Sequence, residues 1–114
     1  MTAIITRTDF NLPTPDCLTP EDLRELFYLD QHDQKKVLAL MEAEGFSFDV
    51  ALDLLDYYML HEDMDTHDLF GKLAKTSQTA TGLDLYFSRK SIASYLMGES
   101  KFIQTTYGVI EGEA

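Results

Sequence analysis

The stretch Phe102-Ile103-Gln104-Thr105-Thr106-Tyr107-Gly108-Val109-Ile110 decides the fold class of this 114-residue chain. Two short runs of strand-forming residues flank turn residues that extend from Thr105 to Gly108. Such a pattern is typical of a β-hairpin. Most of the remaining apolar residues recur at helical spacing. We therefore expect an α+β fold: a mostly helical small domain with a short C-terminal β-hairpin.

A helix is expected immediately before this hairpin. Ser88 is a candidate N-cap for a helix over 89–97, and Gly98 is a typical residue to end it. Its inward residues are Ile92, Tyr95 and Leu96. The polar run 76–82 (Thr-Ser-Gln-Thr-Ala-Thr-Gly) predicts a linker upstream. Residues 83–111 thus form the helix-plus-hairpin part of one domain, 1–114.

Residues 19–76 predict the helical and acidic part of that domain. Thr19-Pro20-Glu21-Asp22 starts its first helix, because Thr caps, Pro suits the first helical position and acids favour the positive helix end. Further helices are expected over 33–44 and over 65–75. Residues 1–18 precede this part and are expected to form an extended and looped lead-in.

Between those helices, Ser47 is expected to cap a third one that runs through about residue 55. Gly45 is a natural stop for the helix before it. The apolar stripe of that preceding helix consists of Val37, Leu38, Leu40 and Met41. Segment 56–62 leaves two alternatives open, a helical extension or a short strand.

The overall charge excludes some partners. Twenty acids against nine bases give a net charge of −11, so nucleic acid and anionic membranes would repel the chain. No apolar run approaches the roughly 20 residues of a spanning helix, and no signal-peptide pattern begins the sequence. The expected location is the cytoplasm of the host cell. Cys17 is the sole cysteine, which excludes an internal disulfide.

The acids are concentrated in the middle of the chain. From Val37 to Gly71 there is no Lys or Arg, although there are nine acids. These acids are Glu42, Glu44, Asp49, Asp53, Asp56, Glu62, Asp63, Asp65 and Asp68. A solvated helix face usually carries both acidic and basic residues, so a block of acids alone indicates a functional role for these charges. We predict that these nine residues bind a basic partner.

The spacing of the acids suits a phosphate mimic. Asp49, Asp53 and Asp56 lie at i, i+4 and i+7, so they share one face of the expected third helix. Carboxylates on successive turns stand about 5–6 Å apart, similar to the phosphates of one DNA strand. The later acids, from Glu62 to Asp68, would continue the row.

Catalytic patterns are missing from the sequence. His61 and His67 lack the four-residue spacing of the helical zinc motif. There is no nucleophile elbow, P-loop or dinucleotide fingerprint. We expect no enzyme activity, no catalytic residue, no cofactor and no metal; a metal-dependent enzyme that uses the two histidines is the minority alternative.

The order of features in residues 19–111 resembles the ArdA-type antirestriction proteins. The run Leu83-Asp84-Leu85-Tyr86-Phe87-Ser88-Arg89 is similar to the segment that precedes their last helix. Leu96-Met97-Gly98 and the segment 102–111 resemble their closing hairpin. Glu62-Asp63-Met64-Asp65, followed by Asp68-Leu69, is similar to the family's acidic stretch upstream. The usual N-terminal domain of that family has no counterpart in residues 1–18.

The resemblance implies a DNA-mimic inhibitor from a phage or mobile element. Such a protein would occupy the basic DNA-binding groove of a restriction–modification enzyme or a CRISPR effector, without binding nucleic acid or membrane itself. It also implies self-association through the C-terminal region. The candidate dimer contacts are Phe102, Ile103, Tyr107, Val109 and Ile110. The alternative function is a non-enzymatic protein–protein adaptor that uses this apolar hairpin.

Overall fold

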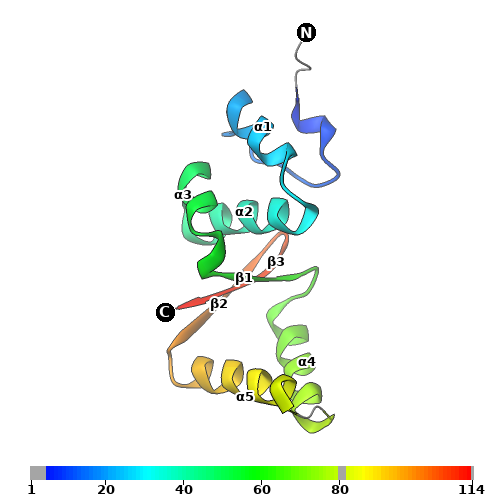
Figure 1. Ribbon diagram of the computed structural model, residues 1–114, viewed down its shortest axis with the longest axis vertical. Coiled ribbons are helices and arrows are strands. Elements are labelled where there is room, and N and C mark those ends of the chain that lie inside the picture. The colour runs from blue at the N-terminus through cyan, green and yellow to red at the C-terminus, as the bar shows by residue number, and fades with distance from the viewer. Residues whose placement is uncertain (1–4, 80–81, 114) are drawn as a thin grey trace.

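The computed structural model describes residues 5–79 and 82–113, the side chains of 76, 77, 79, 83–88 and 95 excepted. The chain forms three layers along a long axis: helices, a sheet, and helices again (Figure 1). Its principal extents are 55 × 24 × 21 Å, and its radius of gyration is 16.0 Å. A compact domain of this length has a radius of gyration of about 13 Å, so the molecule is elongated.

Seven helical segments and three strands make up the layers within the described ranges. The first layer holds η1 (Arg7–Asp9), α1 (Pro20–Phe27), α2 (Gln31–Glu44), α3 (Phe48–Asp53) and η2 (Leu55–Tyr57). The sheet consists of β1 (Met59–Glu62), β2 (Ser100–Thr105) and β3 (Gly108–Glu113). The last layer is formed by α4 (Thr66–Thr79) and α5 (Gly82–Leu96). The expected α+β fold is confirmed.

Local capping sets the helix boundaries of the first layer. The Thr19 hydroxyl accepts a hydrogen bond from the Asp22 amide at 3.1 Å, and the Asp22 carboxylate accepts one from the Thr19 amide at 3.1 Å. Ser47 caps α3 in the same way through the amide of Val50. Gly45 ends α2 with a φ of 71°. These predicted starts and stops are confirmed because each depends on a few neighbouring residues.

Helix α2 lies at the centre of the main core. Val37, Leu38, Ala39 and Leu40 are all buried, so this part of α2 is enclosed on every side. The predicted stripe did not include Ala39, because a stripe has only one buried face. In the structure, α3 packs on one side of α2 and all three strands pack on another. Helix α2 also begins two residues earlier than expected, at Gln31, with Asp30 as its N-cap.

The sheet contains one strand more than the predicted hairpin. The strand order is β1-β3-β2, and both pairs are antiparallel. Segment 56–62 is divided between the two open alternatives: Asp56 and Tyr57 belong to the helical turn η2, and Met59–Glu62 forms the strand β1. Leu60 and Ile103 both lie opposite Ile110, and Leu60 and Ile110 join the core formed with the first helical layer. Val109 is fully buried as well; because neighbouring strand residues face opposite ways, its side chain lies towards the α4–α5 layer.

The predictions for 65–97 need correction at two points. Helix α4 continues to Thr79, so most of the expected linker 76–82 is helical; residues 80 and 81 lie outside the described ranges. Ser88 lies inside α5 and does not cap a helix. Helices α4 and α5 pack against each other, and this packing outweighs the weak helix propensity of Ser, Thr and Gln. Similarly, α3 ends at Asp53, not near 55.

Tyr107 attaches the N-terminal lead-in to the turn of the hairpin. Its hydroxyl donates a 2.6 Å hydrogen bond to the carbonyl oxygen of Pro13, and burial raises the pKa of its phenol, as does the nearby Glu42. Tyr107→Phe should lower the free energy of unfolding by about 1 kcal/mol, because it leaves the Pro13 carbonyl without this donor. Urea denaturation measures the loss. Tyr57→Phe is the matched control, since the Tyr57 side chain is exposed; equal stability of the two variants would contradict the prediction.

Candidate functional site

Three predicted acids lie exposed and without partners on α3 and η2. Ser47 starts α3, and the inward positions of Phe48 and Ala51 leave Asp49 and Asp53 facing solvent. Asp56 is also exposed, but it belongs to η2. The predicted i, i+7 relation on one helix is therefore wrong, since α3 ends before it. Within the described parts of the chain, these three carboxylates make no salt bridge and no side-chain hydrogen bond.

The C-terminal strand places a further carboxylate beside Asp56. A groove of about 270 Å³ is lined by Asp56 and by Glu111 and Glu113 of β3. Glu113 is exposed, whereas Glu111 pairs with a histidine. We name Asp49, Asp53, Asp56 and Glu113 the acidic edge. Sequence reasoning missed Glu113 because only the pairing of β3 with β1 brings the C-terminus beside η2.

Exposed apolar side chains border the acidic edge. Tyr57 is 74% exposed and Met59 is 55% exposed, and both line the same groove. Aromatic residues and methionine are enriched in protein interfaces, whereas Asp and Glu are depleted there. A surface that combines both suits a partner with Lys or Arg around a central apolar contact.

Two predicted acids on α2 instead hold the hairpin in place. Glu44 forms a 2.8 Å salt bridge with Lys101 of β2, and this hydrogen bond raises the pKa of the lysine. Glu42 accepts 3.1 Å hydrogen bonds from the backbone amide and hydroxyl of Thr106 in the hairpin turn. Both carboxylates therefore have partners inside the chain.

The acids at the far end of β1 are also engaged. Glu62 and Asp63 each lie 3.4 Å from the ammonium of Lys35 on α2. Partial burial lowers the pKa of Lys35, but the hydrogen bonds and charges of the two acids outweigh it and raise the pKa overall. Asp65 accepts a 2.7 Å hydrogen bond from the backbone amide of Asp68 in the first turn of α4, where the Asp68 side chain is exposed.

The nine predicted acids therefore do not form the expected row. Strand β1 separates η2 from α4, so the chain crosses the length of this strand before α4 begins (Figure 1). Four strand residues span about 13 Å, so Asp56 is not continued by Glu62 and its neighbours. The structure instead brings Asp56 together with Glu113, which lies outside the predicted block.

The two histidines of the minority alternative lie in different surroundings. His61 pairs with Glu111 at 2.9 Å on the side of the sheet that faces α4 and α5, and its ring stacks with Phe102. His67 is exposed on α4. Among the described residues, no group of three or more His, Cys, Asp or Glu side chains is arranged to hold a metal ion.

The candidate dimer contacts of the hairpin are largely enclosed by the chain itself. Tyr107 is 7% exposed, and Val109 and Ile110 are fully buried. Phe102 and Ile103 are half-buried, and Phe102 packs against Phe70 of α4. The apolar hairpin residues serve the cores on both faces of the sheet, so they do not present the exposed interface that the adaptor alternative requires.

Comparison of the chain with protein-family models, with curated protein sequences and with solved structures finds no match. In the parts of the chain that the structure describes, none of the helices combines the length and the apolar character needed to cross a membrane.

Proposed function

We propose that the protein is a non-enzymatic inhibitor that occupies the basic nucleic-acid-binding groove of a host defence nuclease through its acidic edge. The target class is a restriction–modification enzyme or a CRISPR effector, in the cytoplasm of the host. The observation that carries the proposal is the set of unpaired, exposed carboxylates at Asp49, Asp53 and Asp56. The ArdA-type resemblance of residues 19–111 is in accord with it.

The distinction between paired and unpaired acids supports this assignment. Carboxylates that already meet Lys35 or Lys101 gain less from a second cation than carboxylates that meet only water. The acidic edge holds four charges that a partner's Lys and Arg can neutralise. The nearby Tyr57 and Met59 offer an apolar contact at the same place. The elongated shape suits a groove that normally receives a rod-like duplex.

Neutralising part of the acidic edge should weaken inhibition. For Asp49→Asn/Asp53→Asn, we expect the concentration needed for half-maximal inhibition to rise about tenfold, because two interfacial charge pairs are lost. DNA cleavage by a purified type I restriction enzyme and by a Cas9-type effector is the readout. For the unaltered chain, inhibition should also weaken between about 50 and 200 mM salt.

Glu21→Gln/Glu25→Gln is the matched control. These acids are exposed on α1, with one in the first turn and one four residues later, as Asp49 and Asp53 are on α3. The control removes the same charge and should leave inhibition unchanged. An equal loss of inhibition in both variants would mean that inhibition depends on the net charge and not on the acidic edge. Absence of inhibition of either enzyme class by the unaltered chain would refute the proposed function.

A further inference from the structure

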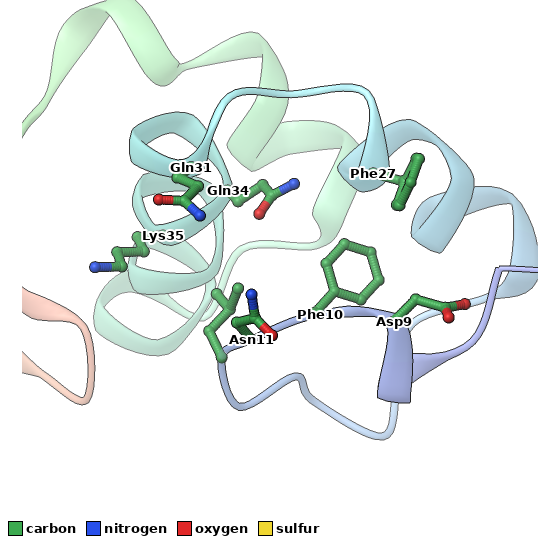
Figure 2. A pocket seen from close by; sticks show the side chains of 8 residues that line it. Asp9, Phe10, Asn11, Phe27, Gln31, Gln34 and Lys35 are labelled. Atoms are coloured by element: carbon green, nitrogen blue, oxygen red, sulfur yellow. The ribbon is translucent and has the colours of Figure 1, made fainter.

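A cavity lies under the N-terminal lead-in, apart from the acidic edge. It measures about 350 Å³ and lies between residues 9–12, the end of α1 and the first turns of α2 (Figure 2). Its lining consists of Asp9, Phe10, Asn11, Leu12, Phe27, Gln31, Gln34 and Lys35. This volume is at the lower end of the range for small-molecule sites, about 300–1,000 Å³.

Fixed contacts shape the walls of the cavity. The Gln34 amide nitrogen donates to the carbonyl oxygens of Leu26 at 3.1 Å and Leu29 at 3.2 Å, which ties α2 to the end of α1. The Phe10 ring packs edge-on against Phe27, with centroids 6.2 Å apart. These contacts hold the lead-in and both helices in place, so the cavity is largely preformed.

The charged residues of the lining are already engaged. The ammonium of Lys35 points away from Phe10 and Asn11 (Figure 2) and meets Glu62 and Asp63. The Asp9 carboxylate accepts a 2.7 Å hydrogen bond from the Thr6 amide. An anionic ligand would find no uncompensated cation here, and the net charge of −11 would repel it.

The unused chemistry of the cavity is neutral. Both Gln34 donors are committed to carbonyls, which leaves its side-chain oxygen as an acceptor. The amides of Asn11 and Gln31 form no hydrogen bond with other residues in the described ranges, so each still offers a donor beside an acceptor. Figure 2 shows these three carboxamides on one side of the Phe10 ring, with Gln31 beside Lys35. Paired donors and acceptors suit the edge of a nucleobase, and an aromatic ring suits its face.

The geometry points to a binding site for an uncharged, flat heterocycle of the nucleobase or nucleoside class. The ring of the ligand lies against Phe10, and the carboxamides of Asn11, Gln31 and Gln34 hydrogen-bond to its edge. This site is independent of the acidic edge and of the proposed inhibition.

Titration of the isotope-labelled full chain with adenosine tests this inference by NMR. We expect saturable shifts of the amides in 9–12 and 31–35. Phe10→Leu should weaken binding about tenfold, because the stacking ring is lost, and Gln31→Leu should weaken it several-fold without affecting the fold, since this side chain is exposed. Phe46→Leu is the control, because Phe46 packs against Tyr58 outside this cavity and should leave binding unchanged.

Two further probes examine the ligand class. Adenosine monophosphate should bind several-fold more weakly than adenosine at low salt, and ribose alone should not bind. The inference is overturned if adenosine gives no saturable shifts, if both Phe10→Leu and Gln31→Leu bind as tightly as the unaltered chain, or if the nucleotide or ribose binds as tightly as adenosine.

Discussion

Gly108→Ala is expected to prevent stable folding or to lower the free energy of unfolding by about 4 kcal/mol or more, among the largest effects of single substitutions. Gly108 begins β3 at a φ of 134°, where L side chains are strained. A Cβ at this position would lie 2.2 Å from the carbonyl oxygen of His61 in the neighbouring strand. Since the backbone fixes the position of a Cβ and the oxygen belongs to the backbone of β1, no side-chain rotation relieves the clash.

Gly98→Ala separates the close contact from the strain of the backbone angle. Gly98 also has a positive φ, 74°, but a Cβ there would meet nothing within 4 Å. Gly98→Ala should lower the free energy of unfolding by only about 1–2 kcal/mol. Chemical denaturation of both variants, with circular dichroism as the signal, gives the comparison. Similar losses in the two variants would show that the approach of β1 to Gly108 is looser than in the structure.

Ile110→Ala should cost about 4 kcal/mol of the free energy of unfolding. Ile110 is fully buried in the central strand, opposite both Leu60 of β1 and Ile103 of β2. Three strands and α2 meet at this point, so the structure has little freedom to collapse around the cavity that the truncation leaves.

The control for Ile110→Ala is Leu96→Ala at the end of α5. Leu96, which the sequence predicted to face inward, is 77% exposed, and its truncation should change stability by about 0.5 kcal/mol or less. Urea unfolding midpoints measure both variants. A loss below about 1 kcal/mol for Ile110→Ala would contradict the placement of this residue at the centre of the core.

Elements with local signals were predictable from the sequence. The caps at Thr19 and Ser47 and the stop at Gly45 act through hydrogen bonds or backbone angles within a few residues, and all three are confirmed. The hairpin 102–110 is likewise a local pattern. Boundaries that depend on packing were not predictable: α4 passes through a polar run because α5 lies against it.

The same difference applies to the candidate site. The exposure of Asp49 and Asp53 follows from the helical period and from the buried Phe48 and Ala51. The partners of the other acids depend on contacts between distant segments. Glu44 meets Lys101 and Glu62 meets Lys35 only because α2 packs on the sheet. The acidic block 37–71 contains no Lys or Arg, but bases from other segments of the chain partly neutralise it in the structure.

The sequence alone determined the fold class, the acidic character of residues 37–71 and the helical face that carries Asp49 and Asp53. Only the tertiary structure decided that 59–62 is a strand and that the hairpin residues are buried. It also decided that Glu113 belongs beside Asp56. The physical reason is range: caps and helical periodicity act over one or two turns, whereas strand pairing and ion pairs join residues that the sequence keeps far apart.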